Sequence, residues 1–157
     1  MPSRIPHPEL WKEGELKIKW VRQNMPLLTG LEKEFSETLP FKGLRIALSV
    51  HLEAKTAYLC EILAKGGAEM YITGSNPLST QDDVAAALVN EGLNVFAAYG
   101  ASEEEYLRGI RSVIEARPNI IIDDGGDLVH TIHNEYPNLI PVTKRSEERR
   151  VGKECRS

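Results

Sequence analysis

The chain has 157 residues, of which 41% are hydrophobic and 27% charged, and this is enough for one globular domain with a packed core. Its formal net charge of -4 provides no broad basic field for a phosphate backbone, so nucleic acid is excluded as an expected partner. The chain has only two cysteines, in dissimilar surroundings, and no run that resembles a signal peptide. No stretch approaches the roughly 20 apolar residues of a membrane span. We therefore expect a cytoplasmic protein without a membrane anchor.

Residues 10–38 are predicted to form two helices. Pro26 lacks an N–H and would clash with the preceding turn, so we expect the helices to meet near Met25 and Pro26, with Pro26 opening the second. The prediction rests on apolar side chains that recur at helical spacing between charged ones: Leu16, Trp20, Val21, Leu27, Leu28, Leu31 and Phe35.

From residue 44 onward, short apolar runs alternate with amphipathic stretches. The expected strands cover 44–50, 70–73, 94–98 and 120–122, and the expected helices 54–65, 81–90, 103–116 and 127–134. Four such units predict an α/β fold: a three-layer parallel sheet with helices on both faces, Rossmann-like or flavodoxin-like, preceded by the N-terminal helices. Gly66, Gly67 and Gly92 are expected at helix C-termini, and Ser102 as an N-cap.

Residues 145–157 differ from everything before them. Five basic and three acidic residues give this tail a charge of +2, and Val151 is its only large apolar residue. The letters resemble the translation of a widely used sequencing-library adapter, so we expect the domain to cover 1–144 and the tail to be non-native and outside the fold. A basic tail that binds an acidic partner is the alternative.

The loops that follow the strands are the expected ligand edge, because the carboxyl ends of parallel strands meet at one side of the sheet. Polar residues gather in these loops: His51 to Thr56, Gly74 to Asp83, Tyr99-Gly100 and Asp123 to Asp127. His51, expected to be partly buried, could relay a proton, or be a core histidine bonded to a backbone carbonyl. Thr56 offers a hydroxyl to a sugar or base, while Glu53 and Lys55 could serve a ligand or only cap and solvate the next helix.

The adjacent carboxylates of Asp123 and Asp124 are expected to repel one another and raise at least one pKa, which suits acid-base chemistry. An acidic turn that caps the next helix is the alternative. Asp127, His130 and His133 share helical spacing and suggest a metal site, but more often form an exposed helix face. The chain contains no GxGxxG turn and no GxxxxGK[ST] loop, so no dinucleotide or triphosphate cradle is recognised.

Several long motifs resemble the N-terminal substrate domain of the adenosylhomocysteinase family. They cover nearly all of residues 10–141 in the family's order and spacing: Trp20 to Leu28 with its Met25-Pro26 step, Lys42 to Ala47, His51 to Thr56, Asn76 to Ala87 and Asp123 to Asp127. The resemblance implies cleavage of S-adenosylhomocysteine to adenosine and homocysteine through transient oxidation of the ribose 3'-hydroxyl by a tightly held NAD, in a homotetramer.

The resemblance also implies roles for individual residues. Asp124 matches the family's catalytic aspartate beside the ribose, and His51 its neighbouring proton-handling histidine. Thr56 matches a threonine on the base side of the adenosine pocket. Further substrate-binding positions are Glu53, Lys55, Asn76, Ser79, Gln81 and Asp127.

Two departures from the family pattern limit what can be carried over. Glu53 and Lys55 stand where many members have a threonine and a glutamate or glutamine, so S-inosylhomocysteine is a competing substrate. The motif Ser-Glu-Glu-Thr-Thr-Thr-Gly, the catalytic lysine and the NAD domain are missing, so we expect the chain to be inactive alone. A purine-nucleoside-binding module without chemistry, and a metal-dependent hydrolase using Asp124, Asp127 and His130, are the alternatives.

Overall fold

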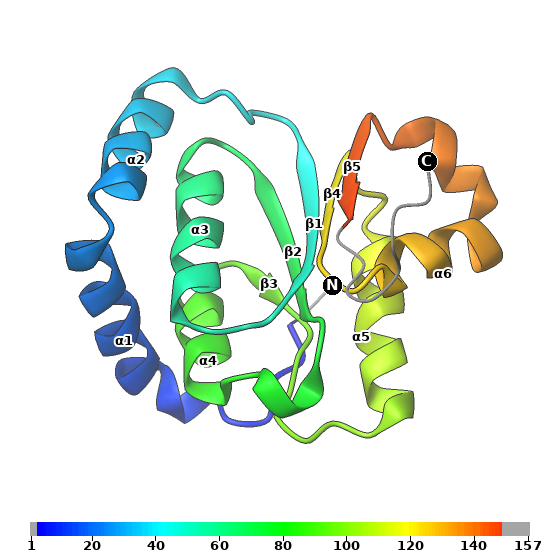
Figure 1. The fold of residues 1–157 in the computed structure, drawn as a ribbon, viewed down its shortest axis with the longest axis horizontal. Helices are drawn as coiled ribbons and strands as arrows, with labels where there is room; N and C mark the ends of the chain where they lie inside the picture. Colours follow the sequence, from blue (N-terminus) through cyan, green and yellow to red (C-terminus); the bar gives the residue numbers. More distant parts are fainter. Residues whose placement is uncertain (1–2, 149–157) are drawn as a thin grey trace, which may run out of the picture.

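The computed structural model describes residues 3–148, which form an α/β fold around one parallel sheet (Figure 1). The strand order is β3-β2-β1-β4-β5, and every neighbouring pair is parallel. This is the Rossmann order, which decides between the two sheet types expected from the sequence. The strands are β1 (Arg45–Val50), β2 (Glu69–Gly74), β3 (Asn94–Val95), β4 (Ile120–Asp123) and β5 (Arg145–Glu148).

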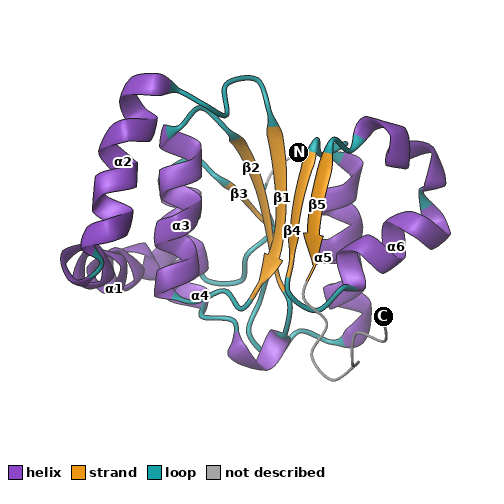
Figure 2. Ribbon diagram, turned by 45° about the horizontal axis from the view of Figure 1, so that its top comes forward, coloured by secondary structure: helices purple, strands orange, loops and turns teal. Residues whose placement is uncertain are grey.

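Helices cover both faces of the sheet, as expected. Figure 2 shows α3 and α4 on one face and α5 and α6 on the other, with α1 and α2 forming an additional outer layer over α3 and α4. The α-helices are α1 (Trp11–Asn24), α2 (Pro26–Thr38), α3 (Ala54–Lys65), α4 (Asp82–Asn90), α5 (Glu103–Glu115) and α6 (Asp127–Glu135). Short 3-10 helices are η1 (Pro8–Leu10), η2 (Pro77–Ser79) and η3 (Pro137–Val142). Within residues 3–148, no helix is both long and apolar enough to cross a bilayer.

Local signals in the sequence account for several element ends. Met25 has non-helical backbone angles between α1 and α2, and Pro26 opens α2, as predicted. Ser102 and Glu105 form a capping box at the start of α5, in which each side chain bonds the other's backbone N–H. Gly67, just after α3, has a φ of +92°, which favours glycine over any residue with a side chain.

Each face of the sheet has its own apolar core. Alternate β1 side chains point to opposite faces, so Ile46 and Leu48 pack towards α3 and α4, whereas Ala47 packs towards α5 and α6. Helix α1 joins the first core through Ile18 and Val21. Gly14 allows α1 to approach α4 closely, since a Cβ there would lie only 2.0 Å from the Asp83 carbonyl oxygen.

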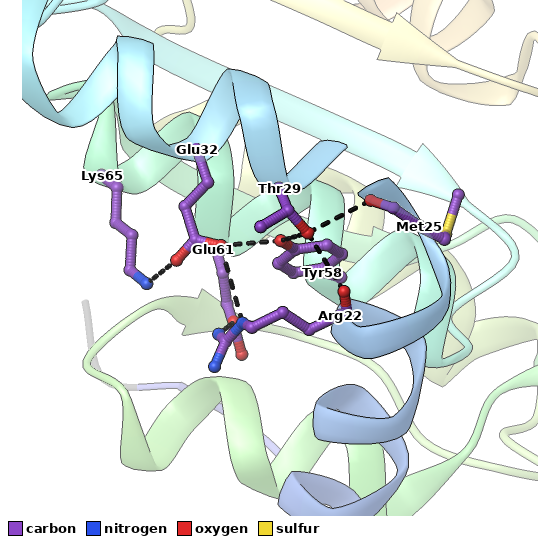
Figure 3. A network of polar contacts seen from close by, with 7 residues as sticks. All are labelled: Arg22, Met25, Thr29, Glu32, Tyr58, Glu61 and Lys65. Atoms are coloured by element: carbon purple, nitrogen blue, oxygen red, sulfur yellow. Dashed lines mark hydrogen bonds and ion pairs between the residues drawn. The ribbon is translucent and has the colours of Figure 1, made fainter. Parts of the chain in front are cut away.

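A polar network fastens the two N-terminal helices to α3 (Figure 3). Arg22 donates to the buried Glu61 at 2.5 Å. Glu32 accepts from the Tyr58 hydroxyl at 2.7 Å and also pairs with Lys65. The Thr29 hydroxyl lies 3.2 Å from that of Tyr58. The bend at Met25 is therefore held by charge pairs as well as by apolar packing.

The first described residues lie along the outer edge of β3. The Arg4 N–H donates to the Val95 carbonyl at 2.8 Å, and the Val95 N–H donates to the Ser3 hydroxyl at 3.1 Å. Strand β3 is shorter than the expected 94–98, and Arg4 forms an isolated parallel bridge with Phe96 just beyond it.

The fold extends four residues beyond the expected boundary at 144. Arg145–Glu148 forms β5 and pairs in parallel with β4, although the tail was expected to lie outside the fold. Pairing needs only main-chain groups, which the exposed side of β4 offers to any extended segment, so the lack of apolar side chains does not prevent it. The adapter-like origin of 145–157 stays a prediction, and 149–157 lie outside the described residues.

Candidate active site

The strand order places a topological switch point between β1 and β4, since the chain moves outward from β1 in one direction through β2 and β3 and in the other through β4 and β5. Ligands of open parallel sheets bind in the crevice beyond the carboxyl ends of the strands at such a point. His51 directly follows β1, and Asp124 directly follows β4. The two predicted central residues therefore come from the two strands that flank this crevice.

His51 and Asp124 lie next to each other. His51 Nε2 is 3.5 Å from Asp124 Oδ2, and the side chains are 51% and 24% exposed. The Asp124 N–H donates to the Ser49 carbonyl at 2.9 Å, which fixes its backbone beside the end of β1. The expectation that both residues meet is confirmed in position, and the pair is open enough to contact a ligand.

The second loop also reaches His51. His51 Nδ1 lies 2.5 Å from the Ser79 hydroxyl, which in turn donates to the Asn76 carbonyl oxygen at 3.0 Å. The Asn76 side chain accepts from the Leu78 N–H at 2.8 Å. His51 is thus a half-exposed histidine bonded to a side-chain hydroxyl. The alternative of a core histidine bonded to a backbone carbonyl is wrong, whereas the expected partial burial leaves 51% of the side chain exposed.

Glu53, Lys55 and Thr56 form the first turn of α3 and its cap. One oxygen of Glu53 accepts from the N–H groups of Lys55 at 3.1 Å and Thr56 at 3.2 Å. The capping role foreseen for Glu53 is confirmed, and the dipole of α3 favours its negative charge. Lys55 is exposed, and Thr56 is buried.

Gln81 and Asp127 contact other elements. Gln81 accepts from Lys17 of α1 at 3.1 Å. Asp127 accepts from the Tyr106 hydroxyl of α5 at 2.9 Å. Their substrate-binding roles stay predictions, because both side chains bond protein partners in this structure.

The two adjacent aspartates at the end of β4 have separate environments. Asp123 is buried and accepts from the N–H groups of Gly126 at 3.0 Å and Val129 at 2.9 Å. Burial raises the pKa of Asp123 despite these bonds, and the like charge that adds to the effect is Asp127. The expected repulsion between Asp123 and Asp124 is therefore wrong as the cause. The turn-capping alternative holds for Asp123, whereas Asp124 faces His51.

Within the described residues, the side chains named in the metal-site alternatives lie beside separate partners. Asp124 lies beside His51, Asp127 beside Tyr106, and His130 Nε2 beside the Asn134 side-chain nitrogen at 2.9 Å. Over residues 3–148, no three His, Cys, Asp or Glu side chains come together as metal ligands. Asp127, His130 and His133 all lie on α6, and no ligand set is assigned to them within residues 3–148.

A cavity of about 230 Å³ lies between α5 and the ends of β2 and β3. The sequence analysis did not foresee it, because its wall combines the N-terminal segment with residues distant in the chain. The hydroxyl of Tyr106, which lines this cavity, also lies 3.3 Å from the Ser75 carbonyl oxygen. The mostly apolar lining includes Ile5, Thr73, Pro77, Thr80, Phe96, Ala97 and Gly109.

The described residues 3–148 do not fit a dinucleotide. In Rossmann sheets the pyrophosphate lies against the N-terminus of the first crossover helix, where a glycine-rich turn lets the backbone approach it. Here the corresponding helix is α3, and its first free N–H groups are already occupied by the Glu53 carboxylate. A phosphate would meet a negative charge there, so no NAD site is assigned to residues 3–148.

Comparisons with known proteins identify the family of the chain. The family model described as S-adenosyl-L-homocysteine hydrolase matches residues 4–156. The S-inosyl-L-homocysteine hydrolase of Methanocaldococcus jannaschii is 51% identical over 131 residues, or 83% of this chain and 32% of that protein. The adenosylhomocysteinase of Pyrococcus abyssi is 50% identical over 141 residues, or 89% of this chain and 33% of that protein.

The chain spans about a third of the length of these relatives. Another adenosylhomocysteinase, from Thermococcus kodakarensis, is 49% identical over 140 residues, or 88% of this chain and 33% of that protein. The matched region includes every strand end that forms the crevice. The chain therefore belongs to the S-adenosyl-L-homocysteine hydrolase family.

Proposed function

We propose that the chain is the substrate-binding part of a hydrolase that cleaves S-adenosyl-L-homocysteine to adenosine and homocysteine, and that it is inactive alone. The observation that carries the proposal is the 3.5 Å approach of His51 and Asp124 at the switch point of the sheet. An imidazole beside a carboxylate can accept and return a proton near neutral pH. The names of the relatives and the family match support the substrate class.

The proposed roles follow the resemblance and the position of each residue. Asp124 and His51 handle protons beside the ribose and its 5' carbon. Thr56 serves the base side, where its helix turn is held by Glu53. Asn76, Ser79 and Gln81 form the second substrate-side loop, and Asp127 a further substrate contact.

The family's oxidation of the ribose 3'-hydroxyl requires NAD, and we propose that NAD is held outside the residues of this chain. What the chain's own residues do is bind the nucleoside, orient the sugar and move a proton at His51. Homotetramer formation and a cytoplasmic location stay predictions from the resemblance and the sequence.

S-inosyl-L-homocysteine is the second candidate substrate, and Glu53 and Lys55 are the observation that favours it. Hypoxanthine presents a carbonyl oxygen where adenine presents an amino group. The exposed Lys55 ammonium donates hydrogen bonds only, so it can pair with that oxygen but repels an amino donor. The relative from Methanocaldococcus jannaschii carries the inosyl name.

Titration of the 15N-labelled chain with S-adenosylhomocysteine and S-inosylhomocysteine tests the site. We expect amide shifts to move around His51, Thr56 and Asp124 with weak affinity, and Asp124→Asn to weaken the response. If Lys55 selects the base, Lys55→Gln reduces the response to the inosyl compound more than to the adenosyl compound. Shifts that move only around the cavity by Tyr106, or no response at millimolar ligand, would contradict the proposal.

A homocysteine-release assay with added NAD tests whether the chain is inactive alone. Release at a rate near that of an intact relative would show that the site is complete within 157 residues. The rival is a nucleoside-binding module without chemistry. The genomic sequence beyond Lys144 distinguishes the two hypotheses. An open reading frame that continues with a threonine-rich motif and a glycine-rich turn supports the enzyme, and a stop codon supports the module.

A further inference from the structure

The Ser79 hydroxyl bridges His51 and a backbone carbonyl. Its Oγ lies 2.5 Å from His51 Nδ1 and 3.0 Å from the Asn76 carbonyl oxygen, to which it donates. Ser79 ends η2, and this short helix is capped by the Asn76 side chain at the Leu78 N–H. The hydroxyl is therefore held in place by the loop before any ligand arrives.

Counting hydrogens decides the direction of these bonds. A serine hydroxyl has one hydrogen, and a carbonyl oxygen has none to give. Ser79 can bond Asn76 and His51 together only if it donates to the carbonyl and accepts from Nδ1–H. The other ring nitrogen, Nε2, is 3.5 Å from Asp124, beyond the usual range of about 2.7–3.2 Å for an N–H···O bond.

We infer that Ser79 is a positioning residue that holds neutral His51 in its Nδ1–H tautomer and leaves Nε2 as the basic nitrogen beside Asp124. The use of that nitrogen rests on the proposed function, whereas the tautomer is a property of the chain itself. Ser79, grouped by resemblance with the substrate-binding residues, then acts through His51, because its hydroxyl is committed to two protein partners.

The arrangement suits a proton acceptor. A ligand group that gives its proton to Nε2 keeps the electron pair of the broken bond, and His51 becomes an imidazolium. Asp124 then stabilises the positive charge from one side. On the other side, the chain from Nδ1–H through the Ser79 hydroxyl to Asn76 strengthens, because each bond polarises the next.

Long-range 15N–1H NMR of the imidazole rings measures the tautomer directly. Spectra of the full chain are recorded at about pH 9, above the ordinary histidine pKa of about 6.5, with His51→Gln used to assign the signals. For the unmodified chain we expect the hydrogen-bearing 15N shift at Nδ1 and the lone-pair shift at Nε2. In Ser79→Ala we expect the balance to move towards the Nε2–H tautomer.

Two further variants separate the hydroxyl from the shape of the side chain. Ser79→Thr retains a hydroxyl and should keep the Nδ1–H tautomer. Ser79→Val introduces a side chain with the same shape as threonine but without the hydroxyl, and it should lose the preference for that tautomer. Ser112→Ala removes a serine bond to a backbone carbonyl on α5 and should leave His51 unchanged. A predominant Nε2–H form in the unmodified chain, or equal tautomer ratios in the Thr and Val variants, would overturn the inference. No nucleoside enters the measurement, so a failed substrate proposal does not affect it.

Discussion

The Tyr106 hydroxyl on α5 donates a hydrogen bond of 2.9 Å to Asp127 in the first turn of α6. The bond connects α5 to α6, the helix that follows Asp124. Burial and the Asp127 carboxylate both raise the pKa of Tyr106 above its ordinary value, because each disfavours the phenolate. The bond thus links α5, whose Tyr106 lines the cavity, to the first turn of α6.

Replacing Tyr106 by Phe should destabilise the chain by about 1 kcal/mol at pH 7, as expected for one lost hydrogen bond. Because the folded pKa of Tyr106 lies above the unfolded value of about 10, its contribution is present below pH 10 and is lost as pH rises through the folded pKa. Urea unfolding between about pH 8 and 11 should therefore show a flatter alkaline decline in Tyr106→Phe.

Tyr71→Phe is the matched control for that experiment. Tyr71 donates to Glu69 at 2.5 Å, and burial, with Glu69 adding to it, raises the pKa of Tyr71 to about 12. This ring lies on β2 and does not bridge two helices. Equal losses of stability in both variants at pH 7 would contradict a special role for the bond to Asp127.

The two neighbouring aspartates should behave differently when changed to Asn. Asp123→Asn should lower the free energy of unfolding by about 1–3 kcal/mol, because an amide offers one acceptor oxygen to the two N–H groups that Asp123 now satisfies. Asp124→Asn should change it by about 0.5 kcal/mol or less, since Asp124 is partly exposed at the crevice. Urea denaturation of both variants measures the difference. A larger loss in Asp124→Asn would show that this carboxylate supports the fold rather than a ligand.

Arg22→Gln should destabilise the chain by about 2 kcal/mol at pH 7, because it leaves the Glu61 carboxylate buried without its partner. Burial raises the pKa of Glu61 even with Arg22 present. Because the folded pKa of Glu61 lies above its unfolded value, Glu61 contributes to the free energy of unfolding below about pH 4.5, where it is protonated in both states. That contribution is lost as pH rises through the folded pKa. The difference between the variant and the unmodified chain should narrow from pH 7 towards about pH 4.

Arg108→Gln provides the control for the buried pair. Arg108 donates to Glu104 one helical turn away, and both side chains are exposed. Such pairs contribute about 0.5 kcal/mol or less, so denaturation curves should barely move. If Arg22→Gln caused an equally small and pH-independent change, the network in Figure 3 would not hold the N-terminal helices in place.

Two glycines should respond in opposite directions to a methyl group. Gly14→Ala should destabilise by about 1–3 kcal/mol, because the added carbon would strike the Asp83 backbone and push α1 away from α4. Gly30→Ala, within α2, meets nothing within 4 Å and should stabilise by about 1 kcal/mol. Thermal unfolding measures both changes. Stabilisation in Gly14→Ala would mean that α1 and α4 are not in close contact.

The order and type of the elements up to α6 could be predicted, because local chemistry specifies them. Pro26 fixes the boundary of α2, and Ser102 with its acidic followers fixes the start of α5. Strand β5 could not be foreseen, since main-chain pairing to an exposed edge leaves no mark on side-chain pattern. The exposure of Leu16 and Trp20 could not be foreseen either. Both follow the helical spacing of apolar residues, yet they lie on the surface of α1 with exposed fractions of 68% and 63%.

At the candidate site, His51 and Asp124 could be brought together from sequence because strand ends of a parallel sheet share one edge. The roles of the residues next to His51 and Asp124 depend on the direction in which each side chain points, and residue spacing in the sequence does not give that direction. Asp123 and Asp124 are adjacent, yet one turns into the fold and the other into the crevice. The bond between His51 and Ser79 joins two loops 28 positions apart, and no local signal indicates it.

The segment beside β3 has a consequence for handling the protein. Ser3 and Arg4 occupy the main-chain groups that the edge of a sheet would otherwise offer to another molecule. Trimming the chain to Pro6 would leave the Asn94–Val95 backbone open as a template for strand pairing between molecules. Self-association in solution should therefore increase after such trimming, although the candidate active site lies at a different part of the sheet.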